Sequence, residues 1–410
     1  MKNITFVIQR YLPAKLTGSE TVIARYAECL TQSKEFRVTV ITSDTAVVRG
    51  IYDPKVEKLP PNESINGVSV KRLVVNWLIG SIYYLIDRFL PNLAGWLGPE
   101  FKFLSFGPHF MGLEQAILAS KPDLIHTGPM PLAHVWETAK IAQKHQIKLI
   151  ISPMMHFGIK SFSNTLITQV LNQAHRVACF TNYERNELIN LGINPTKLTV
   201  VPASYLSSTE LSVAPTKIFL TKYQALENTP YLLFLGTKAF DKGLLTLLEA
   251  MPIIRQQIPN CHLVAAGLAT SAWQQQPLPD YVLNLDYLEG ELKRAAIAGA
   301  SALVVPSRTE SFGIVTLEAM GQGTPVIVGP TGASSELIQA TNENDKGYRL
   351  GKSGIAVPFN QAEILARACI DIMINSNMAQ RFKINGLELA KNYSLDRFMP
   401  LLTNLYSSED

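Results

Sequence analysis

The stretch "SRTESFGIVTLEAMGQGTPVI", residues 307–327, places the carboxylates of Glu310 and Glu318 eight positions apart around a Phe–Gly pair. Side chains that pair on one helix face lie three or four positions apart, so this spacing does not suit a set of ion-pair partners. It predicts a strand, a loop that carries Glu310, and a helix that carries Glu318. At 1.5 Å of rise per helical residue, the two carboxylates would lie roughly 8–12 Å apart.

The same order of strand, loop and helix recurs along the whole chain. Short apolar runs, typical of buried parallel strands, form a first series at 4–8, 37–42, 123–127, 148–152, 176–181 and 197–202, and a second at 231–236, 261–267, 281–286, 302–307, 325–329 and 354–358. Amphipathic helical patterns separate them, for example at 19–33, 131–146, 243–257 and 313–321. Two such series predict an α/β chain of two Rossmann-like, doubly wound domains that face each other across a cleft, with ligands at the carboxyl ends of the strands.

The stretch 202–230 is rich in Ser, Thr and Pro and has no clear period, which indicates a linker. We therefore expect an N-terminal domain over 1–205 and a C-terminal domain over 206–390. A final helix within 391–410 could cross back to the first domain. A length of 410 residues suits two domains.

Composition excludes several classes of protein. Hydrophobic residues make up 47% and charged residues 17%, as in a globular chain with a large core. The net charge of +4, with its basic excess in the first half, suits attraction to an anionic membrane but is too small for a nucleic-acid partner. The four cysteines lie far apart and show no metal or disulfide spacing, so we expect buried thiols in a cytoplasmic chain. We expect no signal peptide and no membrane-spanning segment.

Residues 73–112 interrupt the alternation and are dense in Trp, Tyr, Phe and Leu. One interpretation is a helical excursion that packs on the core. The other is a surface for an apolar acceptor or for the membrane interface, where Trp and Tyr suit the headgroup boundary.

Two further loops carry groups that suit phosphate. "FLGTKAFDKGLL" (234–245) ends a strand at Gly236, carries Lys238 and Lys242, and opens a helix at Gly243, while "PAKLTGSE" (13–20) places Gly18 before the first helix. Backbone N–H groups at helix starts and lysine side chains both favour bound phosphate. With the two carboxylates, these loops predict a site for a nucleotide diphosphate sugar, in which Glu318 holds the ribose and Glu310 the transferred sugar.

"PSRTESFGIVTLEAMGQGTPVI" (306–327) resembles the Glu-x7-Glu signature of the retaining glycosyltransferases of family 4, which have the GT-B fold. The resemblance covers nearly the whole chain and includes "FLGTKAFDKG" (234–243), "CFTNYERNEL" (179–188) and "KNYSLDRF" (391–398). It implies a transferase that moves a sugar from a nucleotide diphosphate sugar to an acceptor with retention, without metal and with no cofactor besides its substrate. It also implies that the domain over 1–205 binds the acceptor and that the domain over 206–390 binds the nucleotide sugar. The predicted loops contain no Asp-x-Asp pair.

The resemblance also implies roles for individual residues. His156, in "SPMMHFG", would lie beside the reacting sugar, and His126, in "DLIHT", is a second histidine candidate. The implied donor contacts are Lys242 and Gly18 on the diphosphate, Glu310 with the backbone of Phe312, Gly313 and Ile314 on the sugar, and Glu318 on the ribose. Thr237, directly after Gly236, stands where the family usually has an arginine, and Lys238 could take its place. This departure leaves the donor's identity open.

The acceptor could be a glycan, a lipid or a lipid-linked sugar, and the chain could lie peripherally on the inner face of a membrane through 73–112. Alternative functions on the same fold are an epimerase-type nucleotide-sugar enzyme and a non-catalytic donor-binding protein. A dinucleotide-dependent oxidoreductase is disfavoured because no Gly-x-Gly-x-x-Gly follows the first strand.

Overall fold

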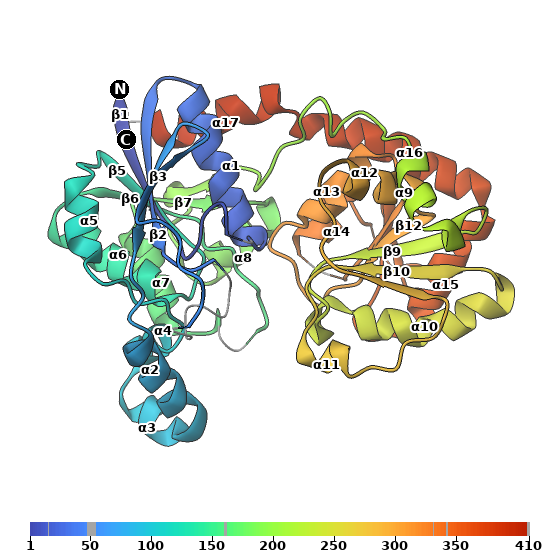
Figure 1. Cartoon of the computed structure of the whole chain (residues 1–410), viewed down its shortest axis with the longest axis horizontal. Helices are drawn as coiled ribbons and strands as arrows, with labels where there is room; N and C mark the ends of the chain where they lie inside the picture. The colour runs from blue at the N-terminus through green and yellow to red at the C-terminus, as the bar shows by residue number, and fades with distance from the viewer. Residues whose placement is uncertain (15, 47–54, 160–161, 331, 342, 408–410) are drawn as a thin grey trace. The chain divides into compact units, whose positions relative to one another are not determined.

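The computed structural model describes residues 1–14, 16–46, 55–159, 162–330, 332–341 and 343–407 (Figure 1). The chain forms two compact units, each with its own sheet. Unit 1 comprises Met1–Ala203 and Met399–Asp410, and unit 2 comprises Ser204–Phe398. The chain thus returns to unit 1 near residue 399, and residues 391–398, which we expected in the returning segment, lie with unit 2.

Unit 1 is built on an eight-stranded sheet of order β3-β4-β2-β1-β5-β6-β7-β8. Six strands confirm the first predicted series: β1 (Lys2–Val7), β2 (Phe36–Ser43), β5 (Leu124–Thr127), β6 (Lys148–Ile151), β7 (Arg176–Cys179) and β8 (Leu198–Val200). They pair in parallel, as buried βαβ strands do.

A hairpin at one edge of this sheet was not predicted. It consists of β3 (Asn62–Ile65) and β4 (Val68–Leu73), which pair antiparallel. Asn66 and Gly67 form its turn with φ of 52° and 83°, and Asn-Gly is the favoured pair for such a two-residue turn. The signal was therefore present in the sequence. The hairpin was nevertheless not predicted, because the charged residues on both strands are typical of a sheet edge rather than of a buried strand.

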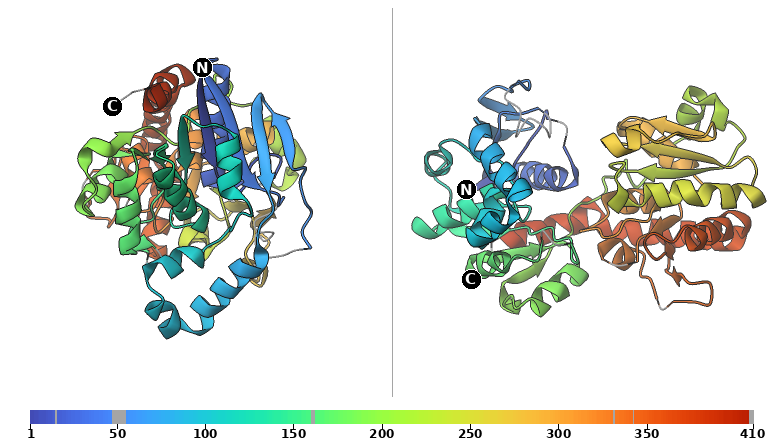
Figure 2. Two further views of the ribbon diagram at one scale, coloured as in Figure 1. Left: turned by 90° about the vertical axis from the view of Figure 1, so that its left-hand side faces the viewer. Right: turned by 90° about the horizontal axis from the view of Figure 1, so that it is seen from below.

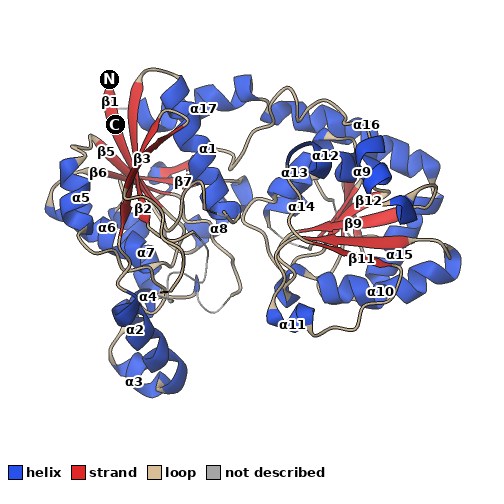
Figure 3. Ribbon diagram, viewed as in Figure 1, coloured by secondary structure: helices blue, strands red, loops and turns tan. Residues whose placement is uncertain are grey.

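Helices cover both faces of the unit 1 sheet (Figure 3). They are α1 (Gly18–Gln32), α5 (Leu113–Ala119), α6 (Ala133–Lys144), α7 (Thr165–Gln173), α8 (Asn182–Asn190) and the final helix α17 (Leu395–Ser407). Tyr406 of α17 is fully buried against the rings of Phe6 and Phe36, and Lys2 Nζ donates to its carbonyl oxygen at 2.7 Å. This packing ties the end of the chain to β1 and β2.

Residues 73–112 form a short helical excursion from unit 1: α2 (Trp77–Phe89), α3 (Pro91–Trp96) and α4 (Pro99–Leu104). The first interpretation, packing on the core, is confirmed for α4, whereas a surface for an apolar acceptor or a membrane stays a prediction. Phe101 and Phe103 of α4 are buried, and the ring of Tyr83 meets Phe101 edge-on at 5.2 Å. The helices α2 and α3, by contrast, extend away from the body of unit 1 in two views (Figures 1 and 2).

Unit 2 is built on a seven-stranded sheet of order β11-β10-β9-β12-β13-β15-β14. The second predicted series is confirmed by β9 (Tyr231–Leu235), β10 (His262–Ala266), β11 (Val282–Leu285), β12 (Ala302–Val305), β13 (Val326–Val328) and β15 (Gly354–Ala356); β14 (Arg349–Leu350) is an added antiparallel edge. Alternate residues of β9 face two cores. Leu232 and Phe234 contribute to one, and Leu233 and Leu235 to the other.

The helices of unit 2 divide between these cores. One core takes residues from α10 (Leu244–Gln257) and α15 (Ala362–Ile374), and the other from α9 (Lys217–Lys222), α12 (Gly290–Gly299) and α13 (Ile314–Gly321). The remaining helices are α11 (Ser271–Gln274), α14 (Ala333–Leu337) and α16 (Ser376–Ala390), and Phe382 of α16 is fully buried. Both units are thus doubly wound α/β layers, as predicted.

Candidate functional site

In unit 2 the loops after the neighbouring strands β9 and β12 touch through their backbones. The Arg308 N–H donates to the Asp241 carbonyl at 2.8 Å. Gly243, which precedes α10, has φ of 74°, and a Cβ added there would lie 2.5 Å from the Pro306 oxygen. Only glycine combines that conformation with so close an approach. The two loops that carry the predicted phosphate and sugar groups therefore form one surface.

Lys242 and Glu310 meet on this surface. Lys242 Nζ lies 2.9 Å from Glu310 Oε1, with side-chain exposures of 23% and 20%, and the Ser307 hydroxyl donates to the same oxygen at 2.8 Å. Burial lowers the pKa of Lys242, but attraction to Glu310 and Asp241 outweighs it, so the pKa lies above its ordinary value. Lys242 is therefore charged at neutral pH, and both side chains are partly open to a ligand.

The predicted sugar-binding backbone lies next to this pair. Gly313 has φ of 90°, and an added Cβ would lie 2.3 Å from Ser334 Oγ, so α14 packs directly on the loop. Phe312 is buried and meets the ring of Tyr393 edge-on. Ile314 is the first residue of α13. The backbone here is thus held from two sides before any ligand binds.

Glu318 lies on α13 as predicted, and it has a partner that sequence reasoning missed. Lys293 of α12 approaches its carboxylate at 2.6 Å, with side-chain exposures of 23% for Lys293 and 11% for Glu318. Nothing in the sequence relates these two positions, because the contact arises from the packing of two helices.

The structure brings Lys238 into the interior of unit 2. Its side chain is 2% exposed, and its ammonium donates to Asn284 Oδ1 at 2.6 Å and to the Leu285 carbonyl at 2.5 Å. Burial lowers its pKa, and the charge of Asp286 opposes that shift. In this arrangement the side chain fastens the loop after β9 to the end of β11. A phosphate contact by Lys238 stays a prediction, and it would require these bonds to break.

The other small residues of the phosphate loops differ in what surrounds them. Gly236 follows β9, and its carbonyl oxygen would lie 2.0 Å from a Cβ at Gly267. Thr237, at the usual position of the arginine, is exposed. Gly18, the first residue of α1 in unit 1, is exposed, and a Cβ added there would meet no atom within 4 Å. Packing within the protein therefore does not explain a glycine at position 18.

A buried ion pair supports the Gly18 turn. Arg10, after β1, donates from Nε to Glu20 at 2.7 Å, and both side chains are buried. Glu20 also accepts the Thr17 N–H at 2.6 Å and the Thr17 hydroxyl at 2.7 Å. The Thr-x-x-Glu spacing of a capping box was readable in the sequence, but the role of Arg10 was not.

The two histidine candidates occupy different environments in unit 1. His156 is partly exposed in the turn after β6, 5.4 Å from the ring of Phe162. His126 is fully buried, with its ring nitrogens bonded to the hydroxyls of Tyr406 and Ser152. Burial lowers the pKa of His126 to about 3. His126 is therefore a neutral core residue rather than a ligand.

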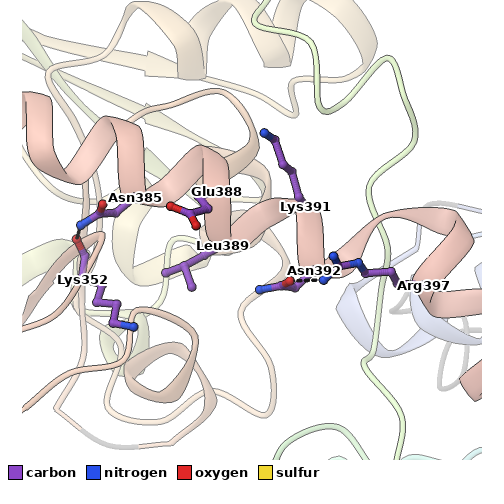
Figure 4. Close-up of a pocket in the computed structure, with 7 residues that line it drawn as sticks. All are labelled: Lys352, Asn385, Glu388, Leu389, Lys391, Asn392 and Arg397. Atoms are coloured by element: carbon purple, nitrogen blue, oxygen red, sulfur yellow. Dashed lines mark hydrogen bonds between the residues drawn. The ribbon is translucent and has the colours of Figure 1, made fainter.

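A separate hollow of unit 2 lies at the end of α16 and is lined by residues of that helix and the following turn together with Lys352 and Arg397 (Figure 4). None of the predicted site residues lines it. Within the described part of the chain, no three His, Cys, Asp or Glu side chains gather as a metal site would require. No helix among the described residues is long and apolar enough to cross a membrane.

Comparison with known families matches both halves of the chain. Residues 217–389 match the family described as "Glycosyl transferases group 1", and residues 16–204 match "Glycosyltransferase Family 4". An uncharacterized glycosyltransferase of Methanocaldococcus jannaschii is 35% identical over 26% of this chain and 29% of its own length. A phosphatidyl-myo-inositol mannosyltransferase of Mycobacterium leprae is 30% identical over 45% of this chain and 46% of its own. The matches thus span less than half of either relative.

Solved structures align over the full chain. HepE of Anabaena, solved in complex with UDP-glucose, superposes with a TM-score of 0.73 at 16% identity, and all of both chains is covered. At this identity the likeness shows the fold alone, and that fold is GT-B, as predicted.

Proposed function

The chain belongs to the group 1 glycosyltransferases, and we propose that it transfers a sugar from a nucleotide diphosphate sugar to an acceptor hydroxyl with retention at the anomeric carbon and without a metal. The observation that carries this proposal is the cluster of Lys242, Glu310 and Ser307 where the loops after β9 and β12 meet. A cation and a carboxylate at adjoining strand ends suit the two halves of such a donor, the phosphates and the sugar hydroxyls.

In this proposal Lys242 acts on the leaving group. The bond from the anomeric carbon to the diphosphate oxygen breaks while the acceptor oxygen attacks from the same face, and the acceptor proton passes to the departing phosphate. The ammonium of Lys242 stabilises the negative charge that grows on the diphosphate, which is the usual way in which a fixed donor lowers a barrier. Donor hydroxyls would replace Lys242 as partners of Glu310, and the ribose would share Glu318 with Lys293.

In unit 1, His156 and Gly18 are the residues that we propose take part in sugar transfer. His156 is partly exposed and follows a strand, so its ring can hydrogen-bond the donor sugar or align the acceptor. The open space at Gly18 supports a close approach of the diphosphate to the backbone at the start of α1.

We also propose that α2 and α3 lie against a membrane and that the acceptor is a lipid or lipid-linked. The observation in support is the exposure of large apolar side chains on these helices, including Phe89 at 71% and Trp96 at 81%. A soluble surface seldom leaves so many apolar side chains together unless they meet a partner. Arg88 at the end of α2 adds a positive charge suited to anionic headgroups.

A donor panel tests the transferase. Purified protein in EDTA is mixed with UDP-, GDP-, TDP- and ADP-sugars, and the melting temperature and slow hydrolysis of each donor are followed. We expect one donor class both to raise the melting temperature and to be hydrolysed. Stabilisation and hydrolysis that appear only when Mg²⁺ is added would refute metal independence, and an inverted product from that donor would refute retention.

A further inference from the structure

We propose that Glu184 is a positioning residue that holds the loop carrying His156 in its working conformation. The inference rests on the proposed role of His156 in sugar transfer. Glu184 lies in the first turn of α8, 2% exposed, and its own N–H donates to Thr181 Oγ1 at 3.1 Å. The backbone that carries this carboxylate is therefore fixed at the N-terminus of a helix.

The carboxylate reaches out of its helix to backbone groups of the neighbouring loop. Glu184 Oε1 accepts the Met155 N–H at 3.0 Å, Oε2 accepts the Phe180 N–H at 2.8 Å, and the Met154 N–H donates to the same carboxylate. Met154 and Met155 directly precede His156. One buried side chain thus satisfies two successive amides next to the candidate histidine.

The loop needs such a support. Met154 has φ of 52°, a left-handed conformation that residues with a Cβ seldom adopt. A second contact from the first turn of α8 is made to Phe157, the residue after the histidine. The Tyr183 ring meets the Phe157 ring edge-on at 5.7 Å. His156 is held between these two contacts.

The ionisation of Glu184 should matter near neutral pH. Burial raises its pKa to about 7, against the lowering effect of the Phe180, Met155 and Met154 N–H groups. The titratable groups that face it are the Tyr26 phenol from α1 and the Cys179 thiol from β7. Burial first, and the Glu184 charge second, raise the pKa of both, so both are neutral at pH 7. Arg185, on the same helix, acts on Cys179 in the opposite direction.

These features give the loop two states. The ionised carboxylate accepts all three N–H groups, whereas a protonated one brings an additional hydrogen into a site that already contains three donors. Protonation should therefore loosen the amides of Met154 and Met155 and release His156. The expected consequence is a turnover that rises with pH through about 7 in the wild-type protein.

The first measurement needs no enzyme activity. Amide hydrogen exchange over residues 152–158, corrected for intrinsic rates, is followed from pH 5.5 to 8.5 in the wild type, Glu184→Gln and the control Glu187→Gln, one turn further along α8. We expect wild type and control to gain protection through about pH 7, and Glu184→Gln to lack protection throughout. Retained protection in Glu184→Gln would overturn the proposal. If that variant does not fold, the wild-type series alone decides.

The second measurement uses the donor found by the panel. Glu184→Gln should lower kcat roughly 10- to 100-fold with little change in KM, and abolish the pH step although His156 is intact. In a His156→Ala background it should cost almost nothing further. An equal loss in both backgrounds would show a general structural effect and overturn the proposal. If Glu184→Gln abolishes the pH-dependent step in amide protection but the wild-type protein turns over no donor, the result would count against the proposed function instead.

Discussion

At the scale of single residues, the two carboxylates that we propose to bind the donor are each held by a lysine: Glu310 by Lys242 and Glu318 by Lys293. A carboxylate that already has a cation at 2.9 Å or less is oriented before ligand arrives, so less ordering remains for the binding step. In the proposed complex, the negative diphosphate would take the place of the carboxylate as the partner of Lys242, and sugar hydroxyls would take the place of the lysine as partners of Glu310.

Replacing Lys242 by Ala tests this directly. We expect kcat/KM to fall by an amount that corresponds to about 2–4 kcal/mol of lost transition-state stabilisation, the usual effect of losing one fixed donor. The free energy of unfolding should change by less than about 1 kcal/mol, because the pair is partly exposed and Ser307 still bonds Glu310. Steady-state kinetics and urea unfolding measure the two effects. Lys217→Ala, an exposed lysine of the same unit, is the control, and unchanged turnover in Lys242→Ala would remove Lys242 from the site.

The sequence indicated which loops carry Lys242, Lys238 and Glu310, but not how their side chains are oriented. Lys242 and Glu310 were both assigned from their loops, but their contact spans 68 positions and depends on β9 and β12 being neighbours. Lys238 shows the opposite outcome. A lysine in a polar loop normally points to solvent, and only the packing of the loop against β11 turns its ammonium inward.

At the scale of elements, two glycines that the sequence makes equivalent differ in the structure. Gly243→Ala should lower the stability of unit 2 by roughly 1–3 kcal/mol from its left-handed conformation alone, with the clash at Pro306 in addition. Gly18→Ala should leave stability unchanged within about 0.5 kcal/mol and weaken donor binding about tenfold, or 1.4 kcal/mol. Urea unfolding measures the stability of both variants, and donor titration measures their affinity for the donor. Equal donor affinity in Gly18→Ala would mean that no ligand approaches that turn.

The exposed face of α2 and α3 makes a prediction for these helices. The double variant Phe89→Ser with Trp96→Ser should fold normally, because surface changes rarely exceed about 0.5 kcal/mol. Its binding to anionic liposomes should fall by roughly tenfold or more, since two aromatic rings lose their burial in the interface. Ile374→Ser, which removes an apolar side chain 62% exposed on unit 2, is the matched control. Liposome sedimentation that is equal for all three proteins would exclude the membrane contact.

The order of strands and helices was largely predictable because buried parallel strands read as apolar runs between amphipathic helices. The edge hairpin of β3 and β4 was missed because its strands carry charges. The division of 73–112 into the packed α4 and the exposed α2 and α3 could not be read either, because both parts are aromatic and only tertiary contacts separate them.

At the scale of the whole molecule, unit 1 carries buried groups whose pKa values differ from those in the unfolded chain. Burial lowers the pKa of His126 to about 3 and of His134 to about 4, against 6.5 when unfolded. The unfolded chain therefore binds more protons below pH 6.5, and these histidines contribute stability that is full above pH 6.5 and is lost as pH falls. Glu184, with its pKa raised from 4.5 to about 7, acts oppositely, and its contribution falls as pH rises between those values.

These opposite signs predict the pH dependence of unit 1 in urea unfolding between pH 5 and 6.5. Two histidines outweigh one carboxylate, so among these three groups the net effect is a loss of stability toward acid. His126→Asn should flatten the slope by up to about 1.4 kcal/mol per pH unit, the value for one proton, and Glu184→Gln should steepen it by a similar amount. Hydrogen exchange in urea measures the stability of unit 1 peptides separately from that of unit 2 peptides. In unit 2, neither substitution should alter the slope of stability against pH. Shifts of the same sign in both variants would contradict the assignment of a neutral buried His126 and a Glu184 that titrates near pH 7.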